Sequence, residues 1–268
     1  MGKAIVTLVA GDSHQRLWNL YSRPSWERYA ARHSYRLIVF ERALDESAQG
    51  GGAQRSLAWQ KLLILGRPEL QGVDRVLWLD SDILINDAAP CAVDGVPEER
   101  IGAVQDQCLL SHPSLATAFA VNNGWPNGPS ALSHMFYKSN GLQPPAGYHL
   151  NGGVLVASPK RHRELFEYIY RTHRETPHSY MEQAALSFEI ISRGLHHPMD
   201  PRFNSLWLEY KTACYSFLFQ IPSLFPLCIA TALQNCFFLH FAGRIADMQR
   251  IDPKVTSSFG KVSGWNHL

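Results

Sequence analysis

Residues 76–79 form an uninterrupted apolar run, Val-Leu-Trp-Leu, that ends directly in Asp80-Ser81-Asp82. A short run of this kind is typical of a strand buried on both faces, because an exposed face would require alternating polar residues. Such strands lie at the centre of α/β sheets, and open α/β sheets bind ligands outside the carboxyl ends of their strands. The sequence therefore predicts an α/β fold with two carboxylates at the ligand-binding edge of its sheet.

The rest of the chain alternates between strand and helix patterns. Apolar runs predict further strands over residues 4–10, 35–40, 153–157 and 236–239. Helical spacing predicts a helix with Ser13 as its N-cap, helices over residues 57–65 and 161–174, and another beginning near residue 180. Residues 111–147 are rich in Gly, Pro, Asn and Ser, which favours long loops. We expect an open, mostly parallel sheet flanked by helices, in a single domain over residues 1–268.

Composition excludes several classes of protein. Lys plus Arg number 25 against 23 Asp plus Glu, so the net charge is only +2 and we expect no nucleic-acid partner. Hydrophobic residues make up 46% of the chain, which argues against disorder. The 5 cysteines are widely spaced without a Cys-x-x-Cys pair, which indicates neither a disulfide framework nor a structural zinc site. We therefore expect buried thiols and a cytoplasmic location.

One long stretch, residues 212–243, carries no Asp, Glu, Lys or Arg. It is long enough to span a bilayer, but Pro222 and Pro226 would break a membrane helix and Gln220 interrupts its apolar side. We expect a buried loop followed by a strand, with peripheral membrane contact through residues 212–239 as the alternative. No charged leader or long apolar segment precedes the first strand pattern, so we expect no signal peptide or anchor in this chain.

Asp80 and Asp82 have the spacing and the side-chain type for binding a hard cation. Alternate residues of an extended chain lie on one face, so both carboxylates can approach one ion. Oxygen ligands suit Mg²⁺ or Mn²⁺, and either ion would neutralise a bound diphosphate. A bare Asp-x-Asp pair is equally compatible with an ordinary Asp-rich turn at the end of a strand. Other motifs of the chain decide between the two interpretations.

Several short segments resemble known motifs in their order along the chain. Trp59 and Lys61 precede the strand that ends in Trp-Leu-Asp-Ser-Asp at residues 78–82. Leu-Asn-Gly-Gly-Val-Leu-Val follows at residues 150–156, Glu-Gln at residues 182–183, and His-Phe-Ala-Gly at residues 240–243. Over about residues 4–245 the chain thereby resembles nucleotide-sugar glycosyltransferases of the GT-A fold, in particular the glycogenin-like and the xyloglucan xylosyltransferase/yeast α-galactosyltransferase families. The ordered set is more specific than any one motif.

The resemblance implies a metal and nucleotide site. Asp82 and His240 would ligate Mn²⁺ or Mg²⁺ directly, and Asp80 would bridge the metal and the ribose of the donor. A nucleotide-sugar donor, a UDP-sugar by analogy, would contact a wider set of residues: Thr7, Ala10, Asp12, Lys61, Asp80, Ser81, Gly243 and Arg244. The glycogenin-like pattern continues from its His-x-x-Gly to a Lys-Pro-Trp, which is missing after Gly243. Arg244 or Arg250 would have to replace that lysine on the diphosphate.

The resemblance also implies which residues face the transferred sugar. Asn151, Glu182 and Gln183 would lie beside the anomeric carbon, where polar oxygens stabilise the positive charge of an oxocarbenium-like state. The families more often have Asp at the position of Glu182, so the reach of this side chain differs by one methylene. These enzymes retain the anomeric configuration of the donor. The acceptor, whether glycan, protein or lipid-linked, does not follow from the sequence.

Other classes of protein could use some of the same residues. A dehalogenase-type phosphatase also has Asp-x-Asp after an apolar strand, but closer to the N-terminus and followed by Thr or Val where this chain has Leu84. A sugar nucleotidyltransferase requires a Gly-rich phosphate loop after its first strand, and residues 9–14 do not form one. A non-catalytic carbohydrate- or nucleotide-binding protein on a decayed transferase fold stays as the main alternative.

Overall fold

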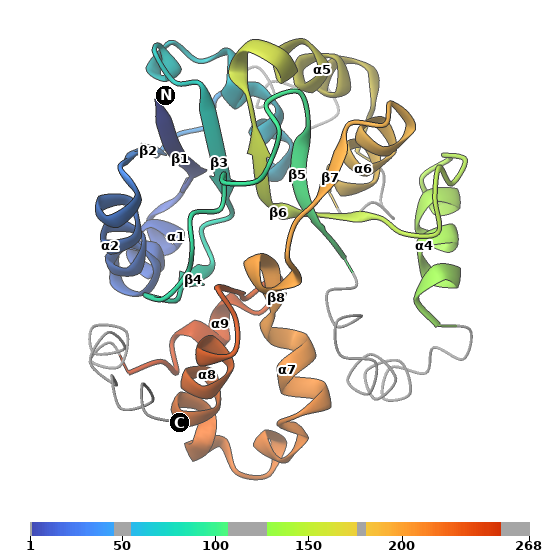
Figure 1. The fold of residues 1–268 in the computed structure, drawn as a ribbon. Helices are drawn as coiled ribbons and strands as arrows, with labels where there is room; N and C mark the ends of the chain where they lie inside the picture. Colours follow the sequence, from blue (N-terminus) through green and yellow to red (C-terminus); the bar gives the residue numbers. More distant parts are fainter. Residues whose placement is uncertain (1, 46–54, 107–127, 176–180, 253–268) are drawn as a thin grey trace.

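A computed structural model describes residues 2–45, 55–106, 128–175 and 181–252 (Figure 1). Its centre is a six-stranded sheet of order β2-β1-β3-β6-β5-β7. The strands are β1 (Lys3–Leu8), β2 (Tyr35–Phe40), β3 (Arg75–Leu79), β5 (Ile101–Gln105), β6 (Leu150–Ala157) and β7 (His196–Pro198). Strand β6 runs antiparallel to both its neighbours, while the other pairs are parallel. The expected open, mostly parallel α/β sheet is confirmed.

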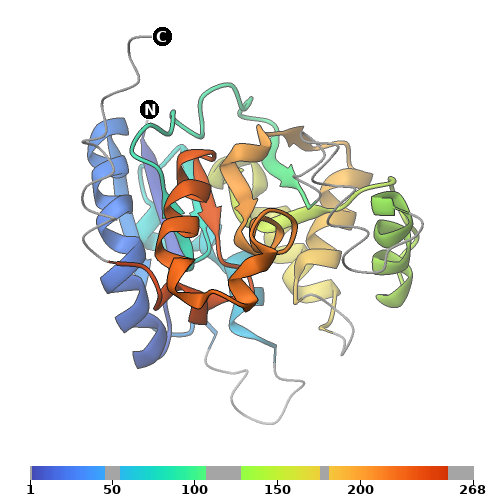
Figure 2. The same cartoon turned by 90° about the horizontal axis from the view of Figure 1, so that it is seen from below.

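Helices cover both faces of this sheet, as Figure 2 shows from below. One face is covered by α1 (Asp12–Leu17), a π-helical turn (Trp18–Ser22) and α2 (Arg23–His33), which are continuous along the chain. The other is covered by a 3₁₀ helix (Leu57–Gly66), α5 (Pro159–Thr172) and α6 (Gln183–Ser192). Alternate residues of β1 pack into the two layers, Ile5 into the first and Ala4 and Val6 into the second. This double burial explains why the central strands are continuous apolar runs.

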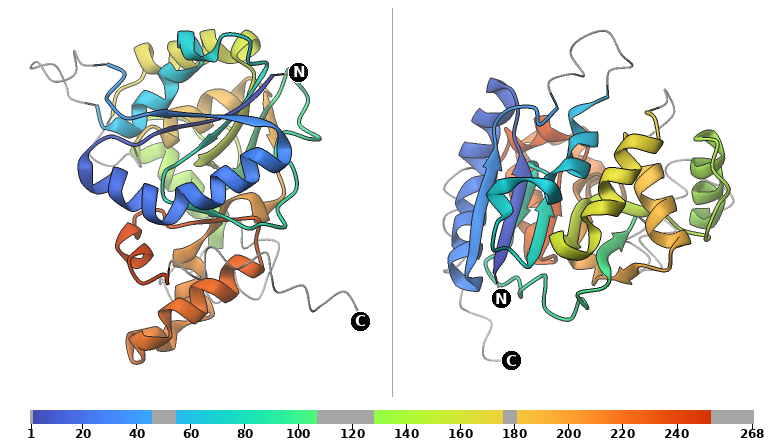
Figure 3. Two further views of the ribbon diagram at one scale, coloured as in Figure 1. Left: turned by 90° about the vertical axis from the view of Figure 1, so that its left-hand side faces the viewer. Right: turned by 90° about the horizontal axis from the view of Figure 1, so that it is seen from above.

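A second, smaller sheet of order β4-β9-β8 lies beyond the carboxyl end of β3. It consists of β4 (Ile83–Ile85), β8 (Ser205–Leu206) and β9 (Phe238–His240). Helices α7 (Trp207–Ala213) and α8 (Phe225–Gln234) lie between β8 and β9 in the sequence, and α9 (Ile245–Met248) comes after β9. Together they form a lobe that projects away from the main sheet in Figure 3. In the described part of the chain, no helix is both long and apolar enough to cross a membrane. Helix α4 (Gly128–Ser139) lies at the opposite side from β2 (Figure 1).

The structure corrects four of the local predictions. Residues 212–239 are mainly helical rather than a loop, because Pro222 and Pro226 stand in the first turns of helical segments, where proline fits. Ser13 is no N-cap, since Gly11 takes that position and α1 begins at Asp12. The loops expected over residues 111–147 include α4, while residues 107–127 lie outside the described residues. The helix expected near residue 180 begins at Gln183.

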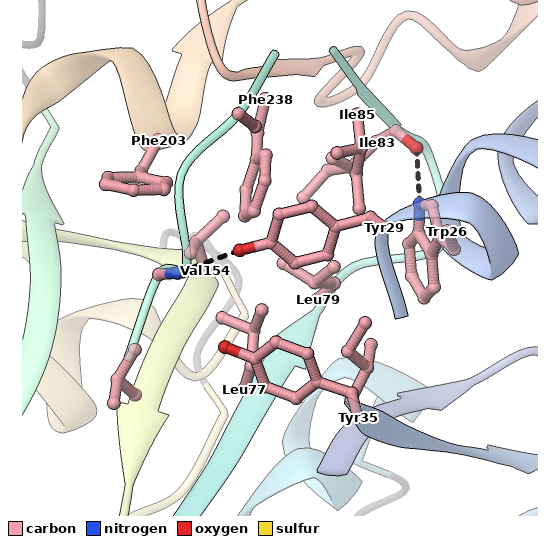
Figure 4. Packing of buried hydrophobic residues seen from close by; sticks show 14 of the residues in the cluster. Trp26, Tyr29, Tyr35, Leu77, Leu79, Ile83, Ile85, Val154, Phe203 and Phe238 are labelled. Carbon is pink, nitrogen blue, oxygen red and sulfur yellow. Dashed lines mark hydrogen bonds between the residues drawn. The ribbon is translucent and has the colours of Figure 1, made fainter. Parts of the chain in front are cut away.

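Aromatic side chains fill the layer between α2, the main sheet and the small sheet (Figure 4). The indole N–H of Trp26 donates to the backbone oxygen of Ile83, the first residue of β4, at 2.9 Å. Trp18 packs edge-on against Trp26, with ring centroids 5.8 Å apart. Tyr29 donates its hydroxyl to the backbone oxygen of Pro90 at 2.8 Å, so its buried polar atom is also paired. The bond from Trp26 holds the chain in place directly after the two carboxylates.

We predict that Trp26→Phe destabilises the protein more than Trp18→Phe. Both replacements remove a similar volume from the same layer, but only Trp26 donates a hydrogen bond, whereas the buried indole nitrogen of Trp18 has no partner among the described residues. The difference in the free energy of unfolding should be about 1–3 kcal/mol, measured by urea denaturation. Equal losses would show that the bond to Ile83 contributes nothing.

Candidate functional site

The two carboxylates lie where β3 leaves the main sheet. The backbone N–H of Asp80 donates to the backbone oxygen of Gly153 on β6 at 2.9 Å, which extends the β3–β6 pairing by one residue. The indole N–H of Trp78 donates to Asp80 Oδ1, also at 2.9 Å. The side chains of Asp80 and Asp82 keep 32% and 16% of their surface exposed. They are therefore held by the backbone and still accessible to a ligand.

The pairing of the small sheet brings His240 to these carboxylates. Antiparallel pairing of β4 with β9 sets His240 opposite Ile83, and the N–H of Phe241 donates to the backbone oxygen of Asp82 at 3.0 Å. His240 Nε2 thus lies 3.2 Å from Asp82 Oδ1 and 3.9 Å from Asp80 Oδ2. Neighbouring ligand atoms around an octahedral ion, at bond lengths of about 2.0–2.6 Å, lie about 3–4 Å apart. The three side chains fit a divalent cation.

Burial and charge act in opposite directions on these groups. Burial would raise the pKa of Asp82, but the adjacent His240 outweighs it and the pKa lies below its ordinary value. Burial would lower the pKa of His240, and the charges of Asp82 and Asp80 raise it instead. Asp82 is therefore ionised at neutral pH, as a carboxylate must be to ligate a cation. Two carboxylates with one imidazole form a ligand set that suits Mn²⁺.

A buried ion pair lies beside this cluster. Lys61 Nζ is 2.6 Å from Glu182 Oε1 and 3.1 Å from Asp80 Oδ1, and it donates to the backbone oxygen of Gly152 at 2.9 Å. Burial would lower the pKa of Lys61, but the charges of Asp80 and Glu182 raise it above its ordinary value. Burial raises the pKa of Glu182, and Lys61 opposes that rise. Because each buried charge depends on the other, removing one partner should cost about 3–5 kcal/mol.

The amides of Asn151 and Gln183 meet on one half-buried carboxylate, Asp106. Asn151 Nδ2 and Gln183 Nε2 each donate to Asp106 at 2.8 Å, and His149 Nε2 lies 2.9 Å from the same carboxylate. Burial would raise the pKa of Asp106, but the hydrogen bonds from His149, Asn151 and Gln183 lower it. The sequence analysis missed Asp106 and His149. The available signal was position, because Asp106 directly follows β5 as Asp80 follows β3.

The structure thus brings seven of the predicted residues into one connected site: Lys61, Asp80, Asp82, Asn151, Glu182, Gln183 and His240. Lys61, expected beside a diphosphate, is paired with both Asp80 and Glu182. This cluster joins the ends of β3 and β5, the start of β6 and α6, and the end of β9. Lys61 and His240, the first and last of these residues, are 179 positions apart in the sequence.

The remaining predicted residues belong to β1 and the segment after it, the turn after Asp80, and the segment after β9. Thr7 is fully buried near the end of β1, and its hydroxyl has no partner among the described residues. Ala10 is half-buried and Asp12 exposed, whereas the backbone oxygen of Ser81 accepts from the hydroxyl of Ser22 at 2.8 Å. Gly243 adopts a φ of 65° in the turn after β9, and Arg244 is exposed next to it. The guanidinium of Arg250 instead lies 4.4 Å from the Phe225 ring.

Comparison with known proteins identifies the fold. No known family model matches the sequence, and no curated protein is detectably similar to it. The structure, however, matches a glycosyltransferase involved in glycosylation of the major capsid of PBCV-1, with a TM-score of 0.54 and 16% identity over 92% of this chain and 100% of the other. The match to the galactosyltransferase LgtC has a TM-score of 0.50 and 16% identity, and it covers 96% of this chain and 94% of LgtC. The match to the bifunctional glycosyltransferase WbbM has a TM-score of 0.54 and 12% identity, and it covers 92% of this chain and 49% of WbbM.

These similarities establish the class of fold. The mixed sheet, the Asp80–Asp82 pair after β3 and the structural matches together show that the chain has the GT-A fold of glycosyltransferases. The resemblance inferred from its short motifs is confirmed at the level of the fold.

We predict that Gly153→Ala weakens cation binding without unfolding the chain. A Cβ at this position would lie 2.3 Å from His240 Cε1, so the imidazole would have to move away from the two carboxylates. The dissociation constant for Mn²⁺, measured by electron paramagnetic resonance, should rise roughly tenfold or more. Gly152→Ala is the matched variant, because its Cβ would instead meet Glu182 Oε1 at 2.7 Å. Equal Mn²⁺ affinity in the wild type and Gly153→Ala would contradict the assignment of His240.

Proposed function

We propose that the chain is a metal-dependent glycosyltransferase that moves a sugar from a nucleotide-sugar donor, a UDP-sugar, to an acceptor. The observation that carries this proposal is the convergence of Asp80, Asp82 and His240 within 4.8 Å of one another, on a GT-A fold. A decayed fold would have no reason to keep three such ligands together with a buried ion pair and two anchored amides beside them. Intact chemistry favours the enzyme over a non-catalytic binding protein.

The donor's nucleotide and diphosphate would lie along the ends of β1 and β3. Asp80, Asp82 and His240 would hold Mn²⁺ or Mg²⁺, which stabilises the negative charge of a leaving diphosphate when bound. Asp80 would also approach the ribose. Thr7, Ala10 and Asp12 would lie under the base and the ribose, at the end of β1. Ser81, Gly243 and Arg244 would border the phosphates, with the exposed guanidinium of Arg244 in place of the missing lysine.

The transferred sugar would lie against Asn151, Gln183 and the ion pair. Glu182, held by Lys61 at 2.6 Å, would orient sugar hydroxyls, and Lys61 would lie near the diphosphate. The Gln183 amide would support the reacting face and stabilise the positive charge on the anomeric carbon as the bond to the diphosphate breaks, with Asn151 beside it. The acceptor oxygen bonds to the anomeric carbon on the same side, and the departing phosphate oxygen takes its proton. Retention of configuration follows from this geometry of attack.

We predict that UDP binds with micromolar affinity only when Mn²⁺ is present, and that GDP does not bind. Asp82→Ala should abolish the metal-dependent part of this binding because it removes a direct ligand, and calorimetric titration measures both effects. Leu84→Ala, two residues further along but with no ligand atom, controls for a change in local packing. Equal UDP binding with and without Mn²⁺ would contradict a metal-dependent donor site, and failure of both nucleotides would favour a decayed fold or a phosphatase.

A second proposal concerns the acceptor side. The lobe of α7 and α8 exposes four large apolar side chains, Phe217, Phe219, Ile221 and Leu227. Arg250 is exposed, and its guanidinium lies 4.4 Å from the centre of the Phe225 ring in the same lobe, so a basic group accompanies the apolar surface. Apolar side chains next to cationic ones are typical of proteins that lie on anionic membranes. We propose that this lobe contacts a membrane surface, where a lipid-linked acceptor would be within reach.

Leu227→Ser should reduce binding to vesicles that contain phosphatidylglycerol. Leu227 and Met135 are both 64% exposed, but Met135 lies on α4 outside the lobe, which makes Met135→Ser a matched control. Insertion of one leucine is worth about 1.5–3 kcal/mol, so binding should fall roughly tenfold or more for Leu227→Ser alone. Equal sedimentation of the two variants would contradict membrane contact through the lobe.

A further inference from the structure

Behind His240 lies a buried amide that belongs to none of the sequence motifs. Asn204, which ends the 3₁₀ helix Pro201–Asn204 just before β8, is fully buried. Its Oδ1 lies 2.8 Å from His240 Nδ1, and its Nδ2 lies 2.8 Å from Asn151 Oδ1. One side chain thus touches both the imidazole beside the carboxylates and the amide expected at the sugar.

The orientation of Asn151 follows from two partners whose roles are unambiguous. Asn151 Nδ2 faces Asp106 Oδ1 at 2.8 Å, and an ionised carboxylate can only accept. Asn151 Oδ1 lies 2.9 Å from the backbone nitrogen of Gly153, which can only donate. If the Asn151 amide were flipped, its oxygen would face the Asp106 carboxylate and its NH₂ group would face the Gly153 N–H, so neither hydrogen bond could form. Asn151 Oδ1 is therefore an acceptor.

The orientation of Asn204 and the tautomer of His240 follow from that assignment. Because Asn151 Oδ1 accepts, Asn204 must donate to it through Nδ2. Asn204 Oδ1 then faces His240 Nδ1, so Nδ1 carries a proton and donates it. The other ring nitrogen, Nε2, is the one that points toward Asp82 at 3.2 Å. The imidazole presents Nε2 to the position between the carboxylates, which is the orientation that a cation ligand requires.

We propose that Asn204 is a positioning residue: it holds His240 with Nε2 toward the cation and, through Asn151, ties the cation site to the sugar site. The inference rests on the function proposed above. Asn151 and Gln183 both donate to Asp106. Continuous hydrogen bonds therefore connect His240, through Asn204, Asn151 and Asp106, to Gln183. A shift of the imidazole on cation binding is passed to the amides that face the sugar.

Two nearly isosteric variants separate the two bonds of Asn204. Asn204→Asp keeps an acceptor for His240 Nδ1 but offers no donor to Asn151, whereas Asn204→Leu offers neither. The dissociation constant for Mn²⁺ alone, measured by electron paramagnetic resonance, should rise about 10–100-fold for Asn204→Leu and stay within about threefold of the wild type for Asn204→Asp. At saturating Mn²⁺, Asn204→Asp should still lose roughly tenfold in turnover because Asn151 is misplaced. Equal Mn²⁺ affinity in all three proteins overturns the inference, as does equal loss in both variants.

A measurement on the wild-type protein covers the case in which Asn204→Leu fails to fold. With Cd²⁺ as a diamagnetic probe, long-range ¹H–¹⁵N spectra of histidine-labelled protein should show His240 protonated at Nδ1, and protonation at Nε2 instead overturns the inference. Asp82→Asn separates this inference from the proposed function. If the wild type does not bind Mn²⁺, or if Asp82→Asn binds it as tightly as the wild type, the proposed cation site is refuted and this inference is refuted with it. If Asp82→Asn loses Mn²⁺ while Asn204→Leu keeps it, only the role of Asn204 is refuted.

Discussion

Strand β4 begins directly after Asp82, and its pairing with β9 sets the far end of the chain against the two carboxylates. This pairing decides the distance from His240 to Asp82, because backbone hydrogen bonds hold both strands at a fixed spacing. Trp26 supports the same place from the other side by donating to the backbone oxygen of Ile83. If β4 paired one residue out of register, His240 would face away from the carboxylates. The cation site is thus a property of the small sheet.

The second constraint is that every buried charge in the site has a partner. Lys61 is paired with Glu182 and Asp80, while Asp106 accepts hydrogen bonds from Asn151 and Gln183. Unpaired charges in the interior cost several kcal/mol each, so these groups hold one another in place. Such pairing orients the polar groups before any substrate arrives, which is the arrangement that favours charge stabilisation in catalysis. Gly152 and Gly153 complete it, because a Cβ at either position would collide with Glu182 or His240.

Local patterns predicted those parts of the structure that local physics controls. The apolar run before Asp80 is a strand buried along its whole length, and residues 35–40 form the edge strand β2. The prediction for residues 212–239 was wrong because proline breaks a helix only in its interior, and Pro222 and Pro226 lie in first turns. Ser13 was wrong as an N-cap because Gly11 takes that position and α1 begins two residues earlier than predicted, at Asp12.

The sequence by itself determined the type of fold, the carboxylate pair at a strand end and the set of motifs that resemble glycosyltransferases. Strand burial and motif spacing each involve only a few neighbouring residues, so both can be recognised directly in the sequence. The motifs named His240 as a ligand by resemblance, but only the tertiary structure places it beside the carboxylates, pairs Lys61 with Glu182, and sets Asp106 and Asn204 against the amides. These contacts join residues 45 to 158 positions apart, and no local pattern encodes them. Their geometry follows from strand pairing and from the need to pair every buried polar group.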